Sequence, residues 1–174
     1  MFHKILVALD QSDLSHQVFE AALTLAKQLD GHLMLVHVLS PVETNFTSPI
    51  FSMPGTYPLL REDVDFYLQQ WRTKETEGLE FLRLKTDIAT TAGIPTEFTQ
   101  MLGDPGHAIC TIAKTWDANL ILIGRRGYTG IGELFMGSIS NYVLHHAPCS
   151  VLAIQGKLDS EPVAAPEPSV YATA

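Results

Sequence analysis

The sequence predicts one domain of the open α/β class, in which a five-stranded parallel sheet has helices on both faces. The length of 174 residues suits a single well-buried domain. Short apolar segments alternate along the chain with segments of helical periodicity. The apolar segments show no polar/apolar alternation, which is typical of parallel strands buried on both sides. Together these observations indicate layers of helices around a parallel sheet.

The first forty residues predict a strand, a helix and a second strand. Residues 4–9 read Lys-Ile-Leu-Val-Ala-Leu, and the polar residues 10–13 that follow supply turn and helix-capping groups. Asp30 and Gly31 end the helix, and residues 33–39 complete a right-handed βαβ unit. The apolar positions that define the helix are Leu14, Val18, Ala21, Leu25 and Leu29.

Residues 41–63 interrupt this alternation, because four prolines and a glycine break any sustained period. A connection of this length favours a functional lid, a partner surface or a mobile segment. Residues 64–92 then predict a helix, although Gly78 weakens its middle. The expected inward side chains of this helix are Tyr67, Leu68, Trp71, Leu79 and Leu82.

The next segments repeat the alternation of strand and helix. Residues 97–101 predict the third strand, and Asp104 and Pro105 suit the cap and first position of the helix that follows. Residues 119–123 predict the fourth strand. The expected buried face of the intervening helix is Ile109, Ile112, Ala113 and Trp116.

The last part of the domain contains one helix and one strand. Residues 138–145 predict the helix and residues 149–154 the fifth strand, so the domain spans residues 1–155. Residues 156–174 are rich in Pro, Ala, Ser and Glu, and therefore predict a flexible C-terminal tail.

Charge and composition exclude several classes of function. The net charge of −8 would repel phosphate backbones, so nucleic acid is not an expected partner. The apolar runs are far shorter than the roughly 20 residues of a membrane helix, so we expect a soluble protein without a membrane partner. Cys110 and Cys149 show neither a paired pattern nor the spacing of a zinc site, which favours a reducing cytoplasm.

A glycine-rich segment lies between the fourth strand and the last helix. Its pattern is Gly124, two residues, Gly127, nine residues, and then Gly137 and Ser138. Glycines let the backbone approach phosphate closely, and a helix N-terminus favours an anion, so residues 124–138 predict a phosphate cradle. The segment has neither the Gly-Lys-Ser/Thr of a Walker loop nor a GxGxxG dinucleotide motif. The alternative is a mobile surface loop in which glycines only turn the chain.

This spacing resembles that of the ATP-binding branch of the universal stress protein family, and the resemblance runs from about residue 2 to residue 154. The opening strand that ends at Asp10, the Val36-His37-Val38 end of the second strand, and Gly103-Asp104-Pro105 agree with it. So does the closing Ala-Pro-Cys-Ser-Val-Leu of residues 147–152. The resemblance implies a Rossmann-like fold, similar to the adenine nucleotide α-hydrolases, with strand order 3-2-1-4-5. Asp10 and Gly124 would then flank one crevice, at the point where the strand order reverses.

The resemblance also implies which residues bind the ligand. Asp10 would lie by the adenosine part, and the backbone of Val38 would meet the adenine edge. Asp10 could alternatively serve only as a helix-capping residue. Arg125 and Arg126 stand within the cradle, where guanidinium groups could reach phosphate oxygens. The implied nucleotide-binding residues are Ala8, Leu9, Asp10, Gln11, Val38, Gly124, Arg125, Arg126, Gly127, Gly137, Ser138 and Ile139.

The sequence shows no nucleophile and base pair at a defensible spacing, so we expect ATP binding without an evident catalytic base. Mg²⁺ would accompany the triphosphate, held mainly by phosphates and water. His145 and His146 point about 100° apart on a helix and make a poor metal site, so no metal ligands are expected in the protein.

The leading functional hypothesis is an ATP-binding stress-response or signalling module that changes a surface for an unknown protein partner. One alternative is a slow Mg²⁺-dependent ATPase or self-phosphorylating enzyme, and another is a binder of AMP or cyclic AMP. The family commonly dimerises through its last strand, which implies a homodimer through residues 149–154.

Overall fold

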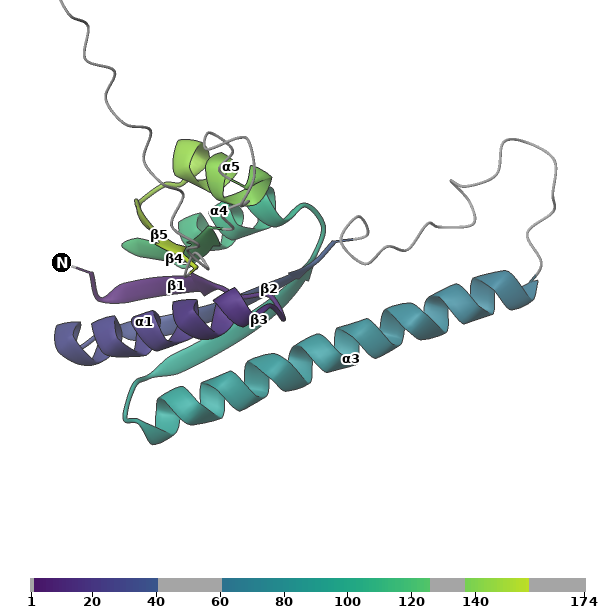
Figure 1. Cartoon of the computed structure of the whole chain (residues 1–174), viewed down its shortest axis with the longest axis horizontal. Helices are drawn as coiled ribbons and strands as arrows, with labels where there is room; N and C mark the ends of the chain where they lie inside the picture. The colour runs from purple at the N-terminus through teal and green to yellow at the C-terminus, as the bar shows by residue number, and fades with distance from the viewer. Residues whose placement is uncertain (1, 41–60, 126–136, 157–174) are drawn as a thin grey trace, which may run out of the picture.

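The computed structural model describes residues 2–40, 61–125 and 137–156, and contains the predicted five-stranded parallel sheet. Its strand order is β3-β2-β1-β4-β5, with every neighbouring pair parallel (Figure 1), so the predicted fold and strand order are confirmed. Most of the predicted loop and tail lie outside the described residues. The elements are β1 (Lys4–Ala8), α1 (Asp13–Leu29), β2 (His32–Leu39), α3 (Arg61–Thr91), β3 (Thr96–Leu102), α4 (Pro105–Thr115), β4 (Leu120–Arg125), α5 (Ser138–His146) and β5 (Ser150–Gln155).

Helices cover both faces of the sheet and bury two apolar layers. Successive side chains of a strand point to opposite faces, so Leu33 and Leu35 of β2 pack under α1 and α3. Met34 and Val36 of the same strand pack on the other face with residues of α4 and α5. This two-sided burial explains why β2 reads as a continuous apolar run rather than an alternating one.

Strand β1 occupies the centre of the sheet and determines where the chain changes direction. It pairs with β2 on one side, with Ile5 opposite Leu33, and with β4 on the other, with Ile5 opposite Leu120. The chain builds outward from β1 through β2 to β3, and then returns to place β4 on the other side. The carboxyl ends of β1 and β4 therefore border the crevice at the topological switch point.

Local capping rules account for two of the helix boundaries. Asp104 accepts a hydrogen bond from the backbone N–H of His107 at 2.9 Å, and Pro105 begins α4, as predicted. Helix α1 ends at the predicted place, but Asp30 rather than Gly31 adopts the left-handed conformation, with φ of 49°. Aspartate tolerates this conformation better than most residues.

Helix α3 is longer and more regular than the sequence indicates. It begins at Arg61, three residues before the predicted start, and passes through Gly78 without interruption. The prediction of Leu68 as an inward residue is wrong, since its side chain is 46% exposed, whereas Leu82 is fully buried and Leu79 half-buried. Figure 1 gives the reason, because the N-terminal part of α3 extends past the sheet and has no strand beneath it. Trp71 is half-buried, and the side chain of Tyr67 lies outside the described residues.

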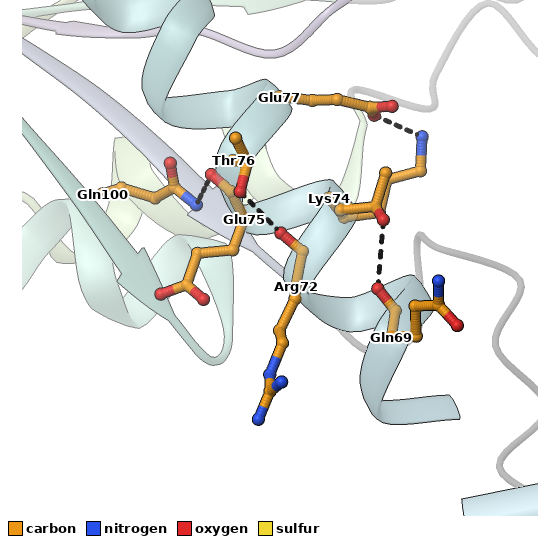
Figure 2. A network of polar contacts seen from close by, with 8 residues as sticks. Gln69, Arg72, Lys74, Glu75, Thr76, Glu77 and Gln100 are labelled. Atoms are coloured by element: carbon orange, nitrogen blue, oxygen red, sulfur yellow. Dashed lines mark hydrogen bonds and ion pairs between the residues drawn. The ribbon is translucent and has the colours of Figure 1, made fainter. Parts of the chain in front are cut away.

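Polar contacts fasten α3 to the edge strand β3 and stabilise its own turns (Figure 2). The side-chain amide of Gln100 on β3 donates to the backbone carbonyl of Glu75 at 3.2 Å. Along the helix, Lys74 pairs with Glu77 at 2.7 Å, but both side chains are nearly half exposed. An exposed pair of this kind contributes little to stability, so burial of apolar residues such as Leu82 is the main attachment of α3.

Gly78 allows α3 to approach β2 closely. A Cβ at this position would lie 2.7 Å from Nδ1 of His37 and 2.8 Å from Oε1 of Gln100. The His37 ring is 7% exposed and packs edge-on against Phe81, so it has little room to move. The glycine is therefore required by packing, although it is a poor helix former.

We expect Gly78→Ala to lower the free energy of unfolding by about 1–2 kcal/mol, because overpacking outweighs the gain of about 1 kcal/mol in helix propensity. Urea denaturation followed by circular dichroism measures this change. The variant Gly78→Ala in a His37→Ala background is the control, and there the alanine should be neutral or stabilising. A stabilising Gly78→Ala in the otherwise unchanged protein would contradict the packing argument.

Candidate functional site

A pocket of about 240 Å³ lies at the carboxyl ends of the central strands. It is bordered by the end of β1, the first turn of α1, the second half of β2, the start of α4, the end of β4 and the start of α5. This is the crevice at the switch point, where open α/β sheets bind ligands. Its lining residues are Ala8, Leu9, Asp10, Ser12, Leu14, Ser15, Val36, Val38, Pro105, Ile109, Ile123, Gly124, Gly137, Ser138, Ile139 and Ser140.

The pocket brings together most of the residues that the sequence singled out. Gln11 is exposed and is not part of the lining, and Arg125 is not part of it either. Arg126 and Gly127 lie outside the described residues. The predicted residues that line the pocket are Ala8, Leu9, Asp10, Val38, Gly124, Gly137, Ser138 and Ile139.

Half of the lining was not anticipated from the sequence. Two signals could have found part of it: Ser12 and Ser15 follow Asp10 in a Ser-x-x-Ser pattern at the start of α1, and Ser140 lies two residues after Ser138. Val36 could have been inferred from Val38, because alternate residues of a strand share a face. Pro105 and Ile109 come from a helix that follows β3, and no local pattern brings them to the pocket.

Asp10 forms the acidic end of the pocket. Its Oδ1 atom accepts hydrogen bonds from the backbone N–H of Ser12 at 3.0 Å, from the Ser12 hydroxyl, and from the Ser15 hydroxyl at 2.7 Å. The backbone N–H of Asp10 donates to Oγ of Ser15 at 2.8 Å. Hydrogen bonds to a charged acceptor are the stronger kind, so this turn holds a carboxylate firmly at the end of β1.

The N-terminus of α5 also lines the pocket and has the opposite electrostatic preference. Gly137 is the N-cap of α5 and makes no side-chain cap, and the first backbone N–H groups of any helix lack acceptors within it. Ser138 adds an exposed hydroxyl, and the helix dipole favours negative charge there. A carboxylate and an anion-favouring helix end therefore line the same pocket.

A glycine is needed at position 124 for space, and not for a left-handed backbone conformation. Of the described glycines, only Gly93 and Gly103 have positive φ. A Cβ at Gly124 would lie 2.9 Å from Cδ2 of Leu14 and 3.4 Å from Cγ2 of Val18. The glycine thus lets β4 approach α1, which keeps Leu14 in the pocket wall.

Arg125 ends β4, and its Nε atom is buried without a hydrogen-bond partner among the described residues. By strand alternation it shares a face with Ile121 and Ile123, which is the face covered by α4 and α5. A buried guanidinium nitrogen without a partner is costly, and a bound anion would supply one.

Among the described residues that line the pocket, Asp10 is the one with an ionisable acidic or basic side chain. Serine hydroxyls line the pocket at Ser12, Ser15, Ser138 and Ser140, but no histidine, lysine or cysteine of the described segments lines it with them. Within residues 2–40, 61–125 and 137–156, no three metal-ligating side chains come together. The same residues contain no helix that is long and apolar enough to cross a membrane.

A family model described as the universal stress protein family matches residues 1–155. The chain belongs to the universal stress protein family. A universal stress protein of Synechocystis is 36% identical over 155 residues, which cover 88% of this chain and 98% of the relative. Universal stress protein YxiE of Bacillus subtilis is 32% identical, with 89% and 100% of the two chains covered.

Solved structures agree on the fold of this universal stress protein. The structure of UspA from Lactobacillus plantarum superposes with a TM-score of 0.67 at 21% identity, covering 88% of this chain and 97% of that one. At this identity the likeness concerns the arrangement of the sheet and helices.

His37 is a buried titratable group beside the acidic end of the site. It lies in β2 next to the pocket residue Val38, on the face covered by α3. Burial lowers the pKa of His37 below its ordinary value, although the Asp10 carboxylate and the Gln100 side chain act in the opposite direction. Desolvation dominates, so the neutral ring is the form that the folded universal stress protein favours.

We expect the free energy of unfolding to decrease as the pH falls below about 6.5, the ordinary pKa of histidine. The unfolded chain binds a proton at His37 more readily than the folded one, so this contribution is complete above that pH and is lost below it. Urea denaturation at several pH values between 8 and 5 measures the slope.

The variant His37→Gln should flatten this slope, whereas His145→Gln, on an exposed histidine of α5, should leave it unchanged. If the free energy of unfolding changed equally with pH in the unchanged protein and in His37→Gln, the assignment of this pH dependence to His37 would be wrong.

Proposed function

We propose that this universal stress protein binds ATP with Mg²⁺ and acts as a nucleotide-dependent stress-response or signalling module for a protein partner. The observation that carries the proposal is that a carboxylate and an anion-favouring helix N-terminus line the same pocket. Asp10 and the N-terminus of α5, with Gly137 and Ser138, both line it. A nucleoside triphosphate has neutral hydrogen-bond donors in its nucleoside part and negative charge in its phosphates, which complements this pocket.

Two structures of similar fold support an adenine nucleotide as the ligand. One is a universal stress protein in complex with cAMP, with a TM-score of 0.56 and 19% identity. The other is the universal stress protein of Archaeoglobus fulgidus in complex with dAMP, with a TM-score of 0.55 and 23% identity. These ligands share the adenine ring, the sugar and one phosphate, so AMP or cyclic AMP is the second candidate for this chain.

The preference for a triphosphate rests on Arg125 and on the glycine spacing. The buried Nε of Arg125 lacks a partner among the described residues, and the family's ATP-binding spacing places Arg126 and Gly127 directly after it. In this proposal Mg²⁺ is held by phosphate oxygens and water. The pocket wall offers Asp10 without an accompanying histidine or lysine among its described residues, so we propose a sensor rather than an enzyme.

Ser138→Ala tests the anion end of the pocket. The exposed hydroxyl contributes no side-chain cap to α5, so its removal should leave stability unchanged. Loss of a hydrogen bond to a charged phosphate should weaken ATP binding roughly tenfold or more. Isothermal titration calorimetry with Mg²⁺-ATP measures the dissociation constant.

Ser150→Ala, on an exposed serine at the start of β5 and outside the pocket, is the matched control and should bind as the unchanged protein does. Titrations with AMP and cyclic AMP separate the two candidate ligands. Equal affinity for AMP and ATP would indicate that the ligand is a nucleoside monophosphate. Steady release of phosphate from ATP would support the enzymatic alternative. Failure to bind any of the three nucleotides would reject the proposed function.

We also propose that two copies pair through β5 at residues 149–154, as the family resemblance implies. Strand β5 is an edge of the sheet, and Leu152 on it is 39% exposed. An open edge with an apolar side chain is a liability for aggregation, and pairing with a second copy covers it. Related copies in such a pairing would be linked by two-fold symmetry.

Leu152→Lys tests this dimer, because a charge on an edge strand opposes strand pairing. We expect light scattering after size exclusion to give a dimer for the unchanged protein and a monomer for the variant. Leu144→Lys is the matched control, since Leu144 is 38% exposed but lies on α5, and this variant should remain dimeric. A monomeric unchanged protein would reject the proposal.

A further inference from the structure

The start of α1 departs from the usual way in which a helix is capped. Ser12 is the N-cap residue, with extended φ and ψ of −86° and 162°, but its side chain makes no cap hydrogen bond. Serine at this position normally accepts from a backbone N–H of the first turn. Here the Ser12 hydroxyl donates to Oδ1 of Asp10 instead. The helix therefore forgoes a stabilising contact in favour of one that fixes a side chain of the pocket.

Ser15 holds the same aspartate from the third position of α1. Its hydroxyl donates to Oδ1 of Asp10 at 2.7 Å, and its oxygen accepts from the backbone N–H of Asp10 at 2.8 Å. Ser15 is 5% exposed and lines the pocket, so water competes little for these bonds. One buried hydroxyl thus contacts both the backbone and the carboxylate of Asp10 and restrains the rotation of that side chain.

Helix α5 offers an internal comparison. Ser140 is also the third residue of its helix, is 2% exposed and lines the same pocket. Its hydroxyl donates to the backbone carbonyl of its own N-cap, Gly137, at 3.0 Å. Two serines in equivalent positions therefore act differently, because Ser140 completes a local backbone turn and Ser15 holds a carboxylate that lines the pocket.

A purely structural interpretation would be that these bonds only join β1 to α1. That role needs the bond between the Asp10 N–H and Ser15, but it does not need three donors to converge on one carboxylate oxygen. Nor does it account for the missing side-chain cap at Ser12. A departure from local rules at a pocket is the kind that functional sites show.

We propose that Ser15 is a positioning residue, which with Ser12 fixes the Asp10 carboxylate and so determines how strongly the pocket binds a donor group of its ligand. This inference rests on the proposed nucleotide function for the identity of the ligand. An ionised carboxylate only accepts hydrogen bonds, so its natural partner is a neutral donor such as a sugar hydroxyl. Preorganisation of this acceptor increases affinity, because less conformational freedom is lost on binding.

The first experiment compares ATP with 2′,3′-dideoxy-ATP by calorimetry. We expect the unchanged protein to prefer ATP roughly tenfold or more, the usual value of a hydrogen bond to a charged group. Ser15→Ala should reduce this ratio towards one, whereas Thr24→Ala, which removes an exposed hydroxyl of the same helix outside the pocket, should preserve it. In Asp10→Asn, further replacement of Ser15 should have no additional effect on the ratio, because Ser15 acts through Asp10. A ratio unchanged by Ser15→Ala would overturn the proposal.

The second experiment needs no ligand and uses the full chain. Three-bond couplings from Cγ of Asp10 to its backbone nitrogen and carbonyl carbon report the side-chain rotamer in solution. We expect one rotamer in the unchanged protein and in Thr24→Ala, and averaging in Ser15→Ala. A single Asp10 rotamer in Ser15→Ala would overturn the inference. If no adenine nucleotide binds, the proposed function fails, and the couplings still decide the role of Ser15.

Discussion

The parallel pairing of β1 with both β2 and β4 is the constraint on which the rest of this structure depends. Ile5 lies opposite Leu33 on one side and Leu120 on the other, so β1 is buried within the sheet. The chain leaves β1 in one direction and later returns on the other side, which opens a crevice at the carboxyl ends. Most groups of the candidate site reach the pocket because their elements end or begin near that edge.

The site combines opposite electrostatic preferences within a small volume. Asp10 is held by hydroxyl and amide donors just after the end of β1, and the first backbone N–H groups of α5 have no acceptor within that helix. The two helices start differently, because Ser12 gives up capping to bind Asp10 and Gly137 offers no side chain at all. Incomplete capping at both helices leaves polar groups that a ligand can use.

On the face of the sheet opposite α4 and α5, packing requires helices and strands to approach one another closely. Gly78 brings α3 against His37, and Gly124 brings β4 against Leu14 and Val18 of α1. Both glycines are needed for space rather than for a left-handed backbone. Since Leu14 also lines the pocket and His37 lies beside Val38, packing on this face sets the shape of the site as well as stability.

The sequence by itself determined the class of fold, the order of elements and the cap at Asp104, because periodicity and capping are local properties. That Asp10, Gly137 and Ser138 line one pocket agrees with what the family resemblance implied, and no local property predicts it. Tertiary structure alone decided the exposure of Leu68, which depends on how far α3 extends past the sheet, and the contributions of Pro105 and Ile109. It also decided that Ser12 and Ser15 bind Asp10, since a serine at the start of a helix can either cap the helix or bind a nearby carboxylate. Distances between elements far apart in the chain are fixed by packing, which no local pattern encodes.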